Sequence, residues 1–225
     1  MSEPEAPPQT ATQRAKPQQT RLPLPEPPPD EPFALLARWL VIAERHERHA
    51  RAACLATIET ADHETEPAAD ARIVLVHGDL ARGEVLLGTD DRSPKARQTQ
   101  TAPRVALVFH WRHLDAQVRL RGIAGRAFDA EDDQTFEDRP RRSRAVAWAS
   151  RQSAVLVDPD ELARRVAAVD ERFAAAEQIP RPPTWRALRV AVDEVELWRA
   201  GARRLHRRLR WRLAGDAWRC ERLEP

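Results

Sequence analysis

The sequence predicts a mainly β domain with flanking helices, of the α+β class, whose antiparallel strands form a barrel. Three observations favour this class. Segments rich in Val, Leu and Ile follow one another after residue 50, turn-like stretches such as Gly78-Asp79 separate them, and only short helical segments interrupt them. The 225 residues suffice for one ordinary domain plus a tail. We therefore expect residues 31–225 to share a single core.

The strands are expected where apolar residues are dense and turn residues flank them. The predicted strands are residues 52–59, 71–77, 84–89, 104–111, 116–128, 186–198, 205–213 and 217–223. Gly215-Asp216 between the last two predicts a hairpin turn. Such a succession of strands, closed by a hairpin, is typical of an antiparallel barrel.

Four helices are expected around these strands. Residues 31–50 form the first, because Asp30 can cap it, Pro32 suits a first turn, and apolar residues recur at helical spacing. A short helix is expected at 94–101. Two more are predicted at about 131–149 and 158–177, the second beginning at Asp158-Pro159.

The first thirty residues differ from the rest in composition. Ten of the 19 prolines fall at or before Pro32, among Gln, Thr and Glu, with few large apolar groups. Such a segment has too little apolar surface to offset the entropy of ordering it. We therefore expect residues 1–30 to be a disordered tail.

Several classes of function are disfavoured. A net charge of +2, from 37 basic and 35 acidic residues, is too small for a general nucleic-acid binder. Seven scattered glycines supply neither a P-loop nor a dinucleotide fingerprint, and no serine-centred nucleophile elbow occurs. Two cysteines and the His46/His49 pair complete no metal site. Without an apolar span the default expectation is a soluble cytoplasmic protein.

Six segments, in order and with consistent spacing, resemble the pyridoxamine (pyridoxine) 5′-phosphate oxidase family from about residue 33 to the end. They are RIVLVH at 72–77, SPKA at 93–96, PRVAL at 103–107 leading to Gln117-Val118, RPRRS at 139–143 with AWASRQS at 147–153, VELW at 195–198 with RLHRR at 204–208, and RLEP at 222–225. Each segment alone is a weak signal, and their order makes the match specific.

The resemblance implies a split β-barrel that binds FMN and works as a homodimer, with the C-terminal hairpin in the dimer contact. The residues it assigns to FMN are Arg72, Ile73, Val74, Leu75, His77, Gly88, Thr89, Lys95, Gln117, Gln152, Ser153, Trp198 and Arg208. By the same resemblance Trp198 and Arg208 come from the second subunit. A dianionic phosphate needs several charge-assisted donors, and a flavin ring needs apolar walls, so these residue types suit the ligand.

The resemblance also implies a substrate site and a reaction. It assigns His77, Arg139, Ser143, Arg204 and His206 to the substrate, with Arg204 and His206 as the catalytic pair over the pyridine ring. In the family reaction the substrate carbon gives a hydride to the flavin, and O2 reoxidises the flavin with release of H2O2. A histidine can move protons near neutral pH, whereas an arginine acts by positioning.

Some positions depart from the family pattern. His77 stands in place of a lysine, Thr135 in place of a tyrosine, and Arg207 in place of an aspartate. These changes leave three functions open: a pyridoxamine 5′-phosphate oxidase, a split-barrel relative acting on another substrate such as one in secondary metabolism, and a non-catalytic flavin- or pyridoxal-phosphate-binding protein. Purely structural roles for some of these residues also stay open. Trp198 would then be a core aromatic, Gln152-Ser153 a loop cap, and residues 203–212 a solvated basic hairpin.

Overall fold

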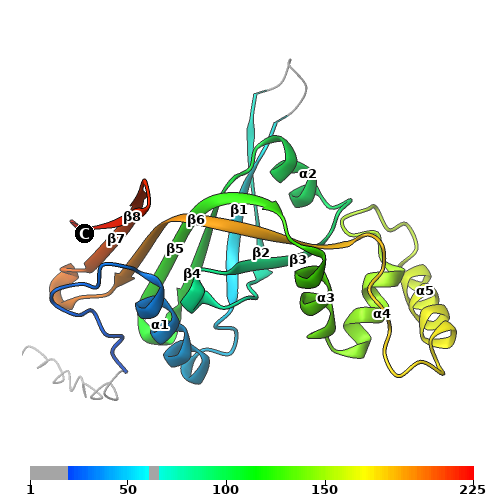
Figure 1. Cartoon of the computed structure of the whole chain (residues 1–225). Coiled ribbons are helices and arrows are strands. Elements are labelled where there is room, and N and C mark those ends of the chain that lie inside the picture. The colour runs from blue at the N-terminus through cyan, green and yellow to red at the C-terminus, as the bar shows by residue number, and fades with distance from the viewer. Residues whose placement is uncertain (1–19, 61–65) are drawn as a thin grey trace, which may run out of the picture.

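The computed structural model describes residues 20–60 and 66–225 and contains one large antiparallel sheet with helices around it (Figure 1). The strand order is β2-β1-β4-β5-β6-β7-β8, and β3 pairs with β6 beside this path. The strands are β1 (Ala52–Glu59), β2 (Ala68–Leu75), β3 (Val85–Asp90), β4 (Arg104–Trp111), β5 (Ala116–Arg126), β6 (Trp185–Arg199), β7 (Arg207–Ala214) and β8 (Ala217–Leu223). The predicted mainly β fold with flanking helices is confirmed.

Strand β6 holds the sheet together. Its 15 residues pair with β5 along most of their length, with β3 near Trp185 and with β7 near Trp198. The register shifts at Arg121/Gly122, where β5 faces a bulge in β6. At about 3.3 Å per residue, the two ends of this 15-residue strand lie about 46 Å apart along it. Elements placed at one end therefore do not touch those at the other.

The core lies under the sheet and beneath helix α1 (Phe33–His46). Alternate residues of β5 point inward, among them Val118 and Leu120, while Gln117 and Arg119 point outward. Trp39 of α1 is buried with Trp111 of β4, and their ring centroids lie 6.4 Å apart. This alternation is what a sheet with one buried and one accessible face requires.

The other helices are α2 (Pro94–Thr101), α3 (Asp129–Glu137), α4 (Arg141–Ala149) and α5 (Pro159–Arg172). The prediction of one helix over 131–149 was wrong, because Pro140 separates α3 from α4. Proline lacks an amide hydrogen and disfavours helical backbone at the residue before it. Helices α4 and α5 pack on each other around Ala145, Val166 and Ile179, outside the main core. No helix among the described residues is long and apolar enough to cross a membrane.

Most predicted strands are confirmed within two or three residues, and two predictions need correction. The strand expected at 71–77 ends at Leu75, so His77 lies beyond it in an isolated bridge to Leu86. The strand expected at 205–213 begins only at Arg207, because a 3-10 turn (Ala202–Arg204) precedes it. The hairpin at Gly215-Asp216 is present, with Gly215 at a φ of 63°.

The expectation of a disordered tail over 1–30 is wrong for residues 20–30, and residues 1–19 lie outside the described residues. Leu22 and Leu24 are buried in the main core. The carbonyls of Pro23 and Pro29 accept hydrogen bonds from the indole nitrogens of Trp39 and Trp211, at 2.6 and 2.9 Å. Composition suggested disorder because the segment has few large apolar groups, but two leucines reach the core and the proline carbonyls are good acceptors for side-chain donors.

Candidate functional site

Three side chains predicted to bind a phosphate converge between β3 and α2. Lys95 Nζ donates to the hydroxyls of Thr89 (2.9 Å) and Ser93 (3.3 Å). Thr89 also donates to Gln152 Oε1 at 3.1 Å, which brings in a residue 63 positions later. Ser93 caps α2 and Pro94 occupies its first turn, as a helix start favours. The predicted residues Thr89, Lys95 and Gln152 therefore share one site.

The ammonium group of Lys95 is buried and forms no ion pair among the described residues, although the negative charge of Asp90 acts on it from nearby and raises its pKa in part. Its hydrogen-bond partners among the described residues are hydroxyls, and nearby Asp90 pairs with Arg92 instead (2.6 Å). Burial, followed by the positive charge of Arg72, lowers the pKa of Lys95 to about 8. A buried cation with only neutral partners is costly unless an anion joins it. The arrangement fits a bound phosphate.

Arg72 lies on β2 at the same side of the sheet. Its guanidinium donates to Thr57 Oγ1 (2.5 Å) and Gln98 Oε1 (2.9 Å), and it pairs with Asp70. Thr57 and Gln98, which the sequence did not single out, therefore fix the position of this arginine. Gln98 lies one helical turn after Lys95 on α2, and that spacing is the signal that could have identified it.

The apolar residues predicted to run along the flavin lie on an edge strand. Ile73 is 70% exposed and Leu75 57% exposed, whereas Val74 between them packs against the core. Large apolar side chains on a sheet edge are unusual unless something covers them. These two residues offer an apolar wall beside Arg72.

Arg139 lines a second, smaller cavity. Its guanidinium stacks on the Trp185 ring, 4.3 Å from the centroid, and reaches the backbone oxygen of Ser143 at 3.4 Å. The Arg139 Nε and the Trp185 Nε1 are both buried and have no hydrogen-bond partner in the described chain. Burial lowers the pKa of Arg139. Two unsatisfied donors in one cavity of about 170 Å³ suit an anionic group.

Gly88 leaves room for the ring of Trp185. A Cβ atom at Gly88 would lie 2.4 Å from Trp185 Cζ2, so the ring on which Arg139 stacks needs glycine there. Gln152 also lines this cavity, between Thr89 and Arg139. Ser153 follows Gln152 at a φ of 66° and is exposed. Trp185 carries no sequence signal for this role, because a tryptophan is usually a core residue.

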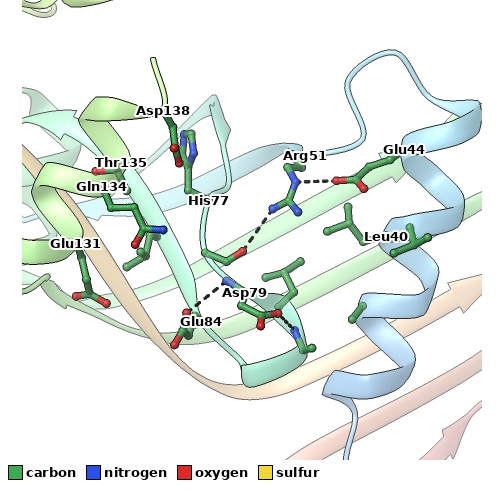
Figure 2. Close-up of a pocket in the computed structure, with 16 residues that line it drawn as sticks. Leu40, Glu44, Arg51, His77, Asp79, Glu84, Glu131, Gln134, Thr135 and Asp138 are labelled. Carbon is green, nitrogen blue, oxygen red and sulfur yellow. Dashed lines mark hydrogen bonds and ion pairs between the residues drawn. The ribbon is translucent and has the colours of Figure 1, made fainter. Parts of the chain in front are cut away.

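His77 lines a different cavity, of about 700 Å³, between α1, the turn at Gly78–Glu84 and α3 (Figure 2). Its imidazole lies beside Asp138, and Thr135 lies on the neighbouring helical turn. Burial lowers the pKa of His77, Asp138 opposes this shift, and Arg139 and Arg51 add to it. His77 is therefore mainly neutral at pH 7, unlike a lysine in its place.

The remaining predicted residues gather at the far end of β6. Gln117, Trp198 and Arg208 are direct partners across β5, β6 and β7. The Trp198 and His206 rings lie 4.7 Å apart between centroids and are tilted by 38°. Arg208 pairs with Glu196 at 2.7 Å, a partner that the sequence did not identify. Trp198 is half-buried, so its interpretation as an ordinary core aromatic is wrong.

Arg204 and His206 lie in the turn before β7, so the expectation of a strand from residue 205 was wrong for His206. Arg203 and Arg204 adopt left-handed backbone, with φ of 52° and 64°. His206 N donates to Arg204 O at 2.9 Å, and Gly201 N donates to His206 Nδ1 at 3.4 Å. A Cβ at Gly201 would lie 1.7 Å from Leu205 O, so this compact turn needs glycine. Non-glycine residues in left-handed backbone often mark functional turns.

Apart from His77 in its separate cavity, the predicted residues form two groups, one at each end of β6. We call the group around Arg72, Lys95, Arg139 and Trp185 the lysine end, and the group around Gln117, Trp198, His206 and Arg208 the histidine end. Thr89 and Gly88 pair with Arg186 and Ala187 at the start of β6, whereas Trp198 lies near its last residue. Along the strand they are about 40 Å apart, so one chain cannot place both around one small molecule.

Family models account for nearly the whole described chain. The model for pyridoxamine 5′-phosphate oxidase matches residues 43–199, and the model for the pyridoxine 5′-phosphate oxidase C-terminal dimerisation region matches residues 185–225. The chain belongs to the pyridoxamine 5′-phosphate oxidase family. Family membership, expected from six sequence segments, is thereby confirmed.

Relatives named pyridoxine/pyridoxamine 5′-phosphate oxidase align over most of their length. The protein from Anaeromyxobacter dehalogenans is 43% identical over 205 residues, covering 91% of this chain and all of the relative. The Rubrobacter xylanophilus protein is 39% identical over 195 residues and covers 87% of each chain.

Solved structures extend the comparison. PhzG from Burkholderia lata 383, in complex with tetrahydrophenazine-1-carboxylic acid, is 32% identical with a TM-score of 0.79, over 89% of this chain and 95% of PhzG. An FMN-binding protein from Nostoc punctiforme is 17% identical with a TM-score of 0.68, over 87% of this chain and 98% of its own. The second likeness confirms the shared fold.

Proposed function

We propose that the chain is an FMN-dependent oxidase that works as a homodimer and converts pyridoxamine or pyridoxine 5′-phosphate to pyridoxal 5′-phosphate, with O2 reduced to H2O2. The buried Lys95, whose ammonium donates only to hydroxyls among the described residues, is the observation that carries the proposal. A phosphate is a suitable partner for this cation, because Lys95 lies at the N-terminus of α2 and near Arg72.

The lysine end would hold FMN through its phosphate and one face of its ring. Arg72, Lys95, Thr89, Gln152 and Ser153 supply polar contacts, and the exposed Ile73 and Leu75 supply an apolar wall. Bound FMN would supply an acceptor for one hydride, that is two electrons and a proton, from the substrate carbon. The protein's own part is to bind, orient and exclude water.

A second copy of the chain would complete the site. Gln117, Trp198 and Arg208 belong to the same predicted flavin contact set as Lys95, yet the histidine end is about 40 Å away along β6. The match of residues 185–225, which include Trp198, His206 and Arg208, to a dimerisation region supports a dimer contact near the histidine end. An isologous dimer would form two equivalent sites, each from the lysine end of one copy and the histidine end of the other.

The substrate would lie between Arg139 of one copy and the turn of the other copy that carries Arg204 and His206. Arg139, whose own Nε and the neighbouring Trp185 Nε1 are both unsatisfied donors, would bind an anionic group such as the substrate phosphate. His206, held against Trp198, can hold or move a proton near the reacting carbon, and Arg204 orients the ring. His77 and Ser143 complete the set predicted to contact the substrate.

A second candidate is a split-barrel flavoenzyme of this family that acts on another substrate. His77 is neutral where the family pattern has a lysine, and Thr135 replaces a tyrosine, so the cavity in Figure 2 has fewer groups that bind phosphate. The similarity to PhzG, which was solved with a phenazine precursor, favours this alternative. A tricyclic acid could still use Arg139 for its carboxylate.

Anaerobic reduction distinguishes these functions. The purified chain, reconstituted with FMN, is mixed with pyridoxamine 5′-phosphate without O2 while the flavin absorbance is followed. The proposal expects bleaching that reverses when air is admitted. Flavin that stays oxidised with both pyridoxamine and pyridoxine 5′-phosphate, but bleaches with a dihydro-aromatic acid, supports the second candidate. Flavin that stays oxidised with every donor would indicate a non-catalytic flavin-binding protein.

A further inference from the structure

Residues 21–29 cross the molecule from the end of β6 to β7 and β8, and we call them the N-terminal strap. Leu22 and Leu24 anchor the strap in the main core. Its carbonyls accept hydrogen bonds from α1 through Trp39 and from β7 through Trp211. In Figure 1 this segment, in dark blue, passes between α1 and the C-terminal hairpin. The strap is therefore a fixed part of the fold near the histidine end.

The turn at residues 200–206 carries Arg204 and His206, and the residues on both sides of it contact the strap. Arg199, the last residue of β6, donates to the carbonyl of Leu22. Arg207, the first residue of β7, pairs with the carboxylate of Glu26 at 3.2 Å, and Glu26 also pairs with Arg222 of β8. Arg204 and His206 lie between these two contacts. The strap thus holds the two residues that flank the turn on either side.

The contact to Arg199 is unusual enough to indicate a specific role. Arg199 is buried, its Nε has no partner in the described chain, and burial together with Arg21 and Arg207 lowers its pKa to about 10. A buried arginine would ordinarily be paired with a carboxylate. Here the backbone carbonyl of Leu22 takes the place of the carboxylate. The position of the strap therefore determines whether the guanidinium of Arg199 has this hydrogen-bond acceptor.

The turn between these contacts needs outside support. Two successive residues, Arg203 and Arg204, have left-handed backbone, which costs free energy unless the surroundings enforce it. Inside the turn, the hydrogen bond from Gly201 N to His206 Nδ1 is long, at 3.4 Å. The stacking of His206 on Trp198 is therefore sensitive to where β7 begins, which is where Glu26 contacts Arg207.

We infer that the N-terminal strap positions the 200–206 turn for turnover, with Glu26 as its positioning residue through Arg207 and Arg222. This inference rests on the proposed function, because Arg204 and His206 are the residues assigned to the substrate. Glu26 does not touch the site itself. Its ion pairs are exposed, so they contribute little to the free energy of unfolding, but they fix the start of β7. A displacement of His206 by about 1 Å can lower turnover by up to about 100-fold.

The test compares Glu26→Gln and Glu26→Lys with Asp193→Asn and Asp193→Lys in the FMN-loaded enzyme. Asp193 makes a similar exposed ion pair with Arg104, away from the turn. We expect kcat to fall about threefold in Glu26→Gln and about tenfold or more in Glu26→Lys, where repulsion from two arginines is added. The Kd for FMN and the melting temperature should match those of the Asp193 variants.

A spectroscopic readout separates positioning from general destabilisation. In histidine-labelled protein, the Trp198 ring current shifts the His206 ring protons, because the two rings lie 4.7 Å apart. We expect these resonances to move in both Glu26 variants, while those of His110 on β4 stay in place. Unmoved His206 resonances, or an equal loss of kcat in the Asp193 series, would overturn the inference. If the wild-type chain shows no oxidase activity, the proposed function fails, and the His206 resonances alone decide the role of the strap.

Discussion

The two ends of β6 are built in different ways. At the lysine end, Lys95 and Arg139 are held inside the fold by hydroxyls, an aromatic ring and a helix start, before any ligand arrives. At the histidine end, Arg204 is exposed in a turn, and its neighbours are held by contacts from the strap. In the proposed function this difference becomes a division of roles, in which the lysine end would bind anions and the histidine end would assist turnover.

The largest effect is expected at the histidine end. His206→Asn removes a group that can hold a proton while keeping a side chain of similar shape at Trp198. We predict that kcat falls about 100-fold or more, as general acid–base groups require. The Kd for FMN should change less than about threefold, measured by fluorescence quenching on binding. A large loss of FMN affinity would show that the two ends do not divide binding from turnover.

The converse change is Lys95→Met at the lysine end. We predict that the Kd for FMN rises about 10- to 100-fold, because one charge-assisted contact is lost. The flavin-free variant should also melt at a higher temperature than the wild type, since a buried charge with only neutral partners is removed. Arg97→Met on the same helix is the control, because Arg97 is exposed. A lower melting temperature for Lys95→Met would contradict the assigned environment.

The lysine end should also make FMN binding depend on pH. The pKa of Lys95 is about 8 in the flavin-free protein, so below pH 8 the ammonium is already charged for the phosphate. Above pH 8 binding requires uptake of a proton, and the Kd should rise up to about tenfold per pH unit. For stability the sign is opposite: the lowered pKa costs stability below pH 8, and this cost is relieved as pH rises toward 10.5. Lys95→Met should abolish both dependences.

The smallest effect concerns substrate choice at His77, in the cavity shown in Figure 2. His77→Lys restores a cation at a position where burial keeps the imidazole mainly neutral. If the substrate is phosphorylated, KM for pyridoxine 5′-phosphate should fall about three- to tenfold, as one added phosphate contact predicts. Glu84→Lys, across the same cavity, controls for added charge alone. An unchanged KM in His77→Lys would favour a substrate without a phosphate near His77.

The sequence predicted the sheet well, because its strands are short apolar runs with turn residues between them. It also identified Thr89, Lys95 and Gln152, whose contacts come from residues far apart in the chain. It missed Trp185 and Glu196, because a tryptophan and a glutamate on a strand have commoner roles in the core and on the surface. Their roles arise from partners, Arg139 and Arg208, that only the folded chain brings close.

The strap shows why local composition misled. Ten prolines before residue 33 indicate disorder when the segment is considered alone. The donors that order residues 20–30 lie on α1, β6 and β7, beginning with Trp39 and Arg199. No pattern within the first thirty residues could reveal these distant donors. The same limit applies to the turn at Arg204, whose left-handed backbone interrupts what appeared to be a continuous strand.

In the proposed dimer, each active site combines the lysine end of one copy with the histidine end of the other. Subunit exchange between Lys95→Met and His206→Asn tests it most directly, with oxidase activity as the readout at an FMN concentration that the Lys95→Met sites do not fill. Each variant alone should be nearly inactive. Because random exchange of an equal mixture leaves one intact site in half of the dimers, we predict recovery of about a quarter of the wild-type activity. No recovery after exchange has been verified would contradict a site shared between two chains.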